Sequence, residues 1–199
     1  MRQTVEKFGG IDILVNNASA ISVTDTESTD MKRYDLMQSI NTRGTYMCSK
    51  FCLPYLKKAK NPHILTISPP LDIFSKGTNW FTGRTAYTMA KYGMTLCAHG
   101  MSEEFRGYGV AVNTLWPRTV VATAAIQNLL GGDEKMNICR NPSVMGDSAY
   151  VILTSDSRKT TGNYFMDDHV LLSSGTKSLE NYRCNPNIRE EDLGPDGYC

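Results

Sequence analysis

Apolar positions along the chain follow two patterns. Short uninterrupted apolar runs are typical of strands buried on both faces of a parallel sheet. In longer stretches the apolar residues recur every three or four positions, which is typical of a helix packed along one face. The short runs predict strands at residues 11–15, 64–67, 110–115 and 163–166, and the periodic stretches predict helices at 2–8, 29–57, 86–105 and 148–153.

Local signals place several ends of these elements. Gly9 stops the first helix, and Ser28 or Thr29 is expected to cap the start of the long second helix. Pro69 closes the second strand because proline cannot donate to a sheet ladder. Strands that alternate with helices of this length imply βαβ units, so the pattern predicts an α/β fold with a parallel sheet and right-handed crossovers.

The end of the chain has a different composition. Beyond Gly175 it is polar, and proline, asparagine and glycine recur. Such a segment buries little apolar surface, so we expect a folded body over residues 1–174 and a loosely held polar tail over 175–199. No internal repeat indicates a second domain.

The overall composition excludes several classes of protein. The chain has 199 residues, a hydrophobic fraction of 41% and a net charge of +1, so nothing in its charge favours nucleic acid or an anionic membrane. Six cysteines occur without a Cys-x-x-Cys pair or a zinc-like spacing, which favours reduced, buried thiols in an intracellular protein and predicts no metal site. No apolar stretch has the length of a signal peptide or of a membrane span.

The strongest chemical signal is the pair Tyr87 and Lys91, separated by four positions (91 minus 87) within the predicted helix at 86–105. That spacing puts both side chains on one helix face about one turn apart. A free tyrosine loses its proton only near pH ~10, and an adjacent ammonium favours the phenolate. Tyr87 is therefore a candidate general acid and base, with Lys91 as its electrostatic partner. The same spacing occurs by chance on many helices, so the assignment depends on its context.

Three further segments supply that context, and the set resembles the short-chain dehydrogenase/reductase family. Asn16-Asn17-Ala18-Ser19 is similar to the family's Asn-Asn-Ala-Gly element, with serine in place of glycine. Asn41 matches the asparagine whose helix holds a water beside the catalytic lysine, although a polar residue here also caps or kinks helices. The segment 112–117 resembles the strand and turn that hold the nicotinamide amide.

The resemblance extends from residue 2 to about residue 170 and implies a Rossmann-like, doubly wound parallel sheet. It implies an oxidoreductase that transfers hydride between NADP(H), with NAD not excluded, and a carbonyl or secondary alcohol of lipid-like character. The implied catalytic residues are Tyr87, Lys91, Asn41 and Ser68. The implied cofactor contacts are Asn16, Asn17, Ala18, Tyr87, Lys91, Pro117 and Thr119, with Thr123 an equal alternative to Thr119.

Two further positions depart from the family pattern. The family usually places a serine about a dozen residues before the tyrosine, whereas Ser68 precedes Tyr87 by 19 positions (87 minus 68). Three alternatives follow: Ser68 orients the substrate oxygen, Ser75 or Thr78 in the following loop replaces it, or Tyr87 acts alone. Arg118 stands where the family has glycine, and it is either a partner for a cofactor phosphate or acidic substrate or an ordinary surface arginine.

The start of the chain departs further. The family opens with a strand, a glycine-rich turn and a helix N-terminus that receives the pyrophosphate, and the sequence has no such segment before residues 11–15. We therefore expect a sheet that is incomplete on its N-terminal side, with an apolar flank and backbone groups exposed on that strand. This leaves an alternative to catalysis, in which an inactive truncated chain pairs with a full-length copy.

The resemblance also bears on partners and location. Family members commonly dimerise, which predicts a homo-oligomer formed through the long helices at 29–57 and 86–105, with a small carbonyl or alcohol as the other partner. The family members that the matching segments most resemble are peroxisomal or mitochondrial. The protein is expected in one of these organelles, or in the cytoplasm if no targeting signal is used.

Overall fold

The computed structural model describes residues 1–71 and 82–196, which form two compact units. The first unit is Met1–Thr114 with Ser155–Tyr164, and the second unit is Leu115–Thr154 with Phe165–Cys199. The strands are β1 (Ile13–Asn16), β2 (His63–Ile67), β3 (Ala111–Trp116) and β4 (Tyr164–Met166). The α-helices are α1 (Arg2–Phe8), α2 (Met31–Met37), α3 (Gly44–Leu56), α4 (Thr85–Glu104), α5 (Gly132–Met136), α6 (Ser143–Thr154) and α7 (Asp167–Ser173). The π-helical segments are η1 (Gln38–Arg43) and η5 (Ile126–Leu130), and short 3₁₀ turns lie at η4 (Arg106–Tyr108), η6 (Glu180–Tyr182) and η7 (Glu190–Asp192).

The strands form a sheet in the order β1-β2-β3-β4. β1 and β2 pair in parallel, with Ile13 opposite His63 and Asn16 opposite Thr66. β2 and β3 are almost entirely buried, whereas Ile13 and Val15 of β1, at one end of the strand order, are each 44% exposed. The predicted α/β fold with a parallel sheet is confirmed, and so is the apolar flank predicted for the first strand.

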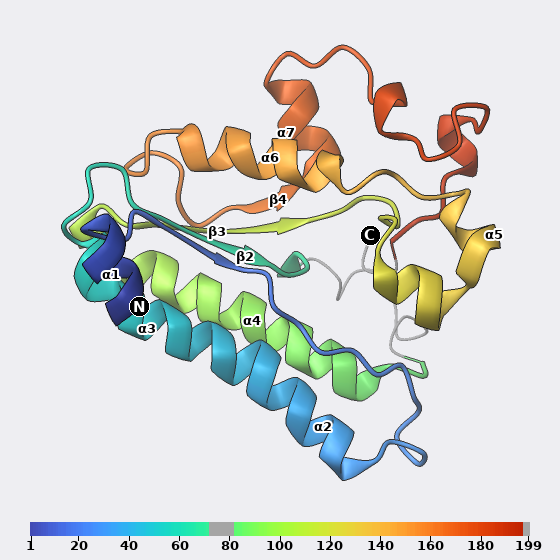
Figure 1. Cartoon of the computed structure of the whole chain (residues 1–199), viewed down its shortest axis with the longest axis horizontal. Coiled ribbons are helices and arrows are strands. Elements are labelled where there is room, and N and C mark those ends of the chain that lie inside the picture. The colour runs from blue at the N-terminus through green and yellow to red at the C-terminus, as the bar shows by residue number, and fades with distance from the viewer. Residues whose placement is uncertain (72–81, 197–199) are drawn as a thin grey trace. The chain divides into compact units, whose positions relative to one another are not determined.

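In the first unit, α3 and α4 lie side by side on one face of the sheet (Figure 1). Their inward residues join the strands in one apolar core, whose members include Cys52, Leu56, Ile64, Met101, Phe105 and Val112. α2, η1 and α3 follow one another without a break, as the predicted helix at 29–57 requires. α4 packs closely against η1 at Gly93. The closeness is shown by the fact that a Cβ added to Gly93 would lie only 2.2 Å from Oγ1 of Thr42.

The start of the long helix differs from the prediction by one position. Asp30 is the N-cap, and its carboxylate accepts the N–H of Lys32 at 2.8 Å. Ser28 and Thr29 do not cap the helix because their hydroxyl groups donate back to Asp25 in the preceding turn. The competing local bonds decide which of three consecutive polar residues begins the helix.

In the second unit, α6 and α7 pack against each other around Val144, Leu171 and Leu179. α6 is longer than the predicted helix at 148–153 and begins at Ser143. The side chain of Asn141 accepts the N–H of Ser143 at 3.0 Å and so supplies the missing partner at this helix start.

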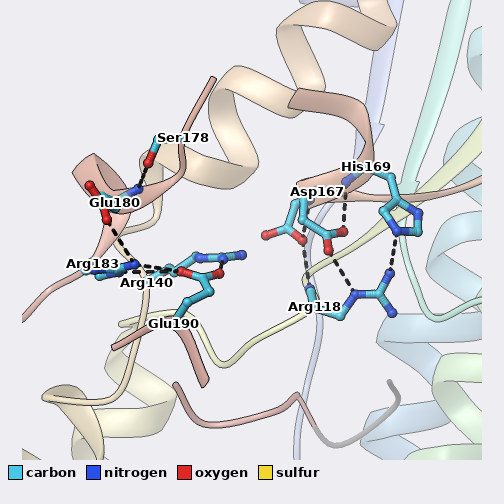
Figure 2. A network of polar contacts seen from close by, with 9 residues as sticks. Arg118, Arg140, Asp167, His169, Ser178, Glu180, Arg183 and Glu190 are labelled. Atoms are coloured by element: carbon cyan, nitrogen blue, oxygen red, sulfur yellow. Dashed lines mark hydrogen bonds and ion pairs between the residues drawn. The ribbon is translucent and has the colours of Figure 1, made fainter. Parts of the chain in front are cut away.

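Residues 175–196 are packed within the second unit, so the expectation of a loosely held tail is wrong for them. Leu179 and Leu193 are buried. Glu190 forms ion pairs with Arg183 and with Arg140, whose side chain is 1% exposed (Figure 2). The polar composition did not predict this packing, because ion pairs and backbone hydrogen bonds, rather than a large buried apolar area, hold much of the segment.

Candidate active site

Tyr87 and Lys91 lie near the start of α4 in the first unit. The Lys91 side chain is buried, and its Nζ donates to the carbonyl oxygen of Ile67 at the end of β2, at 2.7 Å. Tyr87 is partly buried and packs against the cluster that contains Met37 and Ala90. Lys91 is therefore buried on the helical turn that follows Tyr87 and is fixed to the end of β2.

Two further residues of α4, which the sequence did not single out, form hydrogen bonds with the segment after β2. The Thr95 hydroxyl donates to the carbonyl oxygen of Pro69 at 2.7 Å, and the Tyr92 hydroxyl donates to that of Pro70 at 3.2 Å. Thr95 could have been found, because it follows Lys91 by four positions and therefore continues the same helix face. These bonds fix the end of β2 relative to Lys91.

Ser68 is fully buried within this fastened segment. Its Oγ has no hydrogen-bond partner among the described residues. Its two proposed substitutes, Ser75 and Thr78, lie outside the residues that the structure describes. The hydroxyl of Ser68 thus has unused hydrogen-bonding capacity but no exposure to solvent.

Asn41 lies in η1 and is fully buried. Its Oδ1 accepts the N–H of Ala20 at 2.7 Å, and its Nδ2 donates to the carbonyl oxygen of the same residue at 3.0 Å. Ala20 packs against the same cluster as Tyr87, so Asn41 joins the segment after β1 to the surroundings of Tyr87. Both polar ends of the Asn41 amide are thus bonded to Ala20, and Asn41 lies in a π-helical turn, a geometry frequent at functional sites.

Asn16, Asn17 and Ala18 have different environments at the end of β1. Asn16 is buried, and its Nδ2 donates to Oγ of Ser49 in α3 at 3.1 Å, with Oγ1 of Thr66 at 3.5 Å. Asn17 and Ala18 are exposed. Asn16 therefore ties the sheet to α3, while the next two residues are accessible to a ligand.

Pro117, Thr119 and Thr123 follow β3 and belong to the second unit. Thr119 is buried, and its Oγ1 has no hydrogen-bond partner among the described residues. The Oγ1 of Thr123, in contrast, accepts the N–H of Ile126 at 3.5 Å. Of the two hydroxyl groups, that of Thr119 is thus the one that is buried without a hydrogen-bond partner among the described residues.

Arg118 is engaged by the first turn of α7 (Figure 2). Its Nε pairs with Asp168 at 3.0 Å, its Nη2 lies 3.1 Å from Nε2 of His169, and its N–H donates to Oδ1 of Asp167 at 2.8 Å. Burial raises the pKa of Asp167, an effect opposed by the N–H donors of Arg118 and Asp168. The Arg118 guanidinium is therefore paired with Asp168 of its own chain, whereas the sequence left open whether it binds a phosphate or an acidic substrate or is an ordinary surface arginine.

Among the described residues, the buried histidine is His63, and its ring is already in contact with the backbone. His63 is buried in β2, its Nε2 contacts the carbonyl oxygen of Ser155 at 3.1 Å, and burial lowers the pKa of its imidazole. Within residues 1–71 and 82–196, no helix is long and apolar enough to cross a bilayer. The same residues contain no cluster of His, Cys, Asp and Glu arranged to bind a metal ion.

Comparison with known sequences identifies relatives. The pattern of the short chain dehydrogenase family matches residues 1–132. Hydroxysteroid dehydrogenase-like protein 2 of Xenopus laevis is 53% identical over 186 residues, which are 94% of this chain and 43% of the relative. The chain therefore spans less than half of the length of the curated relatives that it matches.

Comparison with solved structures identifies proteins of the same family and fold. A short chain dehydrogenase of Mycobacterium thermoresistibile is 53% identical, has a TM-score of 0.88, and is matched over 99% of this chain and 68% of that one. A more distant structure, the angucycline C-6 ketoreductase LanV with bound NADP, is 19% identical, has a TM-score of 0.68, and is matched over 83% and 65% of the two chains. The distant likeness concerns the fold alone, and the expected Rossmann-like fold is confirmed.

Proposed function

The chain belongs to the short chain dehydrogenase family, and from that premise we propose an oxidoreductase that transfers hydride between NADP(H) and a carbonyl or secondary alcohol. We propose a lipid-like substrate, from the resemblance to hydroxysteroid dehydrogenase-like protein 2. The observation that supports catalysis best is Lys91, buried on the turn after Tyr87 and fixed to the end of β2.

Tyr87 is proposed as the acid and base. In reduction its hydroxyl donates a proton to the substrate oxygen, and in oxidation its phenolate accepts one. Lys91 is proposed to stabilise the phenolate, because it lies on the helical turn after Tyr87 and its side chain is buried. The nicotinamide cofactor, when bound, supplies or accepts the hydride.

The residues present fit such a cofactor. Asn17 and Ala18 are exposed beside the buried anchor Asn16, and the buried hydroxyl of Thr119 has no hydrogen-bond partner among the described residues. From the family resemblance we propose Asn16, Asn17, Ala18 and Lys91 as cofactor contacts in the first unit. From the same resemblance we propose Pro117 and Thr119 as cofactor contacts in the second unit. NADP is preferred over NAD from the family resemblance, and the NADP bound by LanV is compatible with this choice.

Ser68 has a smaller proposed role than Tyr87. Its side chain is fully buried, so a substrate oxygen has no direct access to the hydroxyl. We therefore propose that Tyr87 is the main donor to the substrate oxygen, and that Ser68 supports the segment after β2.

We also propose a homo-oligomer formed through the helical layer of the first unit. Tyr46 and Phe51 of α3 and Met89 and Leu96 of α4 are exposed, and Leu96 reaches 60%. Large apolar side chains grouped on adjacent helices are typical of surfaces that bind another protein. A peroxisomal or mitochondrial location is proposed from the family resemblance alone.

The test compares Tyr87→Phe with Tyr108→Phe, which removes the same hydroxyl from an exposed tyrosine outside the proposed site. Oxidation of NADPH is followed with a panel of hydrophobic ketones and aldehydes, and NADPH affinity is measured by fluorescence titration. We expect Tyr87→Phe to lower kcat by about a hundredfold or more while NADPH affinity changes little, because general acid–base catalysis contributes about 10²–10⁴-fold.

Two results count against the proposal. Full activity of Tyr87→Phe would remove Tyr87 from the chemistry. Absence of NADPH binding by the unmodified chain would reject catalysis by this chain and favour the inactive-partner alternative, which sedimentation of the chain mixed with a full-length copy then tests.

A further inference from the structure

The end of the described chain holds the last residue of β3 and the loop that follows it. This segment, residues 116–120, is called the cofactor loop because it contains Pro117 and Thr119. Asp196 accepts a hydrogen bond from Nε1–H of Trp116 at 2.6 Å, and its own N–H donates to the carbonyl oxygen of Arg118 at 3.0 Å. Asp196 is thus bonded to the residues on both sides of Pro117.

The contact continues along residues 193–196, called the C-terminal clamp. Thr119 and Pro195 form an antiparallel bridge, and the N–H of Val120 donates to the carbonyl oxygen of Gly194 at 2.9 Å. Gly194 fits tightly, because a Cβ added there would lie 2.8 Å from the side chain of Val120. The clamp therefore pairs with the cofactor loop along its backbone.

A second anchor holds the loop within the same unit. The N–H of Arg118 donates to the buried carboxyl of Asp167 at 2.8 Å (Figure 2). The backbone of the loop is thereby bonded to two separate segments, while the Thr119 hydroxyl has no hydrogen-bond partner among the described residues. A loop whose backbone is fixed in this way is pre-organised for a ligand.

We infer that the C-terminal clamp is a positioning element of the cofactor site and that Asp196 is its positioning residue. The inference rests on the proposed function. Asp196 acts through Trp116 and Arg118, and its bond to the indole N–H is strengthened by the charge of the carboxylate. Because the clamp holds the cofactor loop, its loss lowers NADPH affinity, whereas the proton transfer assigned to Tyr87 is affected less.

The experiment compares three variants of the chain. Asp196→Ala removes the acceptor, and Asp196→Asn keeps an oxygen that accepts the same bond. The matched control is Asp192→Ala, because the carboxylate of Asp192 pairs with Arg189 in an exposed turn four positions earlier (196 minus 192). KM for NADPH, kcat, and hydrogen exchange of the peptide covering residues 116–122 are measured for each.

For Asp196→Ala we expect KM for NADPH to rise about tenfold, kcat to stay within about threefold, and exchange of the peptide to accelerate. For Asp196→Asn, the KM for NADPH and the exchange rate of the peptide should be close to those of the unmodified chain. For Asp192→Ala, both should equal those of the unmodified chain. If Asp196→Ala fails to fold, Trp116→Phe removes the donor instead and is expected to show the same changes.

The contrary outcomes are separable. Unchanged KM in Asp196→Ala overturns the positioning role, and it does so even if exchange accelerates, because the clamp would then be structural only. A fall in kcat with unchanged KM also overturns it. If the unmodified chain binds no NADPH, the proposed function fails, and the positioning role fails with it.

Discussion

A single methyl group at Gly93 should separate α4 from η1. The ideal Cβ of an alanine at this position would lie 2.2 Å from Oγ1 and 2.8 Å from Cγ2 of Thr42. The Thr42 hydroxyl cannot simply rotate away without loss, because it donates to the carbonyl oxygen of Ala90 at 3.1 Å. Gly93 is two positions after Lys91, so any movement of α4 here also displaces the lysine.

The size of the effect follows from three terms. Overpacking a well-packed contact costs about 1–3 kcal/mol. Loss of the Thr42 hydrogen bond adds about 1 kcal/mol of destabilisation. The higher helix propensity of alanine relative to glycine stabilises the protein by about 1 kcal/mol and so offsets this loss. Gly93→Ala is therefore expected to lower the free energy of unfolding by about 1–3 kcal/mol, which corresponds to a fall in Tm of about 2–12 °C.

The assay is thermal unfolding followed by circular dichroism, with Gly100→Ala as the control. Gly100 lies in the same helix, and a Cβ there meets nothing within 4 Å. Gly100→Ala should therefore stabilise the protein by about 0.5–1 kcal/mol through helix propensity alone. Thr42→Ala combined with Gly93→Ala should recover part of the loss, because the two residues are in contact. Equal stability of Gly93→Ala and Gly100→Ala would refute the close contact.

Two further variants test buried polar groups. Ser68→Ala should raise the free energy of unfolding by about 1 kcal/mol, because it removes a buried hydroxyl without a described partner. Its kcat should stay within about threefold of that of the unmodified chain. A loss of about a hundredfold in kcat would instead make Ser68 a donor to the substrate oxygen. Burial raises the pKa of Asp167 above its ordinary value of 3.8. The folded protein therefore binds this proton more tightly than the unfolded chain does. As a result, the stability that Asp167 contributes falls as the pH increases from 3.8 through the pKa of the folded state. Asp167→Asn keeps Oδ1 as acceptor, so its Tm relative to the unmodified chain should be higher near neutral pH than near pH ~4, and a difference independent of pH would contradict the assignment.

The sequence predicted the elements whose patterns are local. The helix at 29–57 and the strand at 64–67 were recognisable because burial of one helix face or of a whole strand imposes a short period on the apolar residues. The chemistry of Tyr87 and Lys91 was also local, since one helical turn relates them. Ser28 and Thr29 show the limit of such signals, because a bond to Asp25 removed both from the cap position.

Local patterns therefore determined the fold class, the family resemblance and the candidate acid and base. The tertiary structure alone decided the contacts between distant segments: Asn41 with Ala20, 21 positions away, Lys91 with Ile67, 24 positions away, and Trp116 with Asp196, 80 positions away. No periodicity relates such positions, because their separation depends on the path of the intervening chain. For the same reason the polar composition after Gly175 did not reveal a clamp, since hydrogen bonds to a specific loop leave no apolar pattern in the sequence.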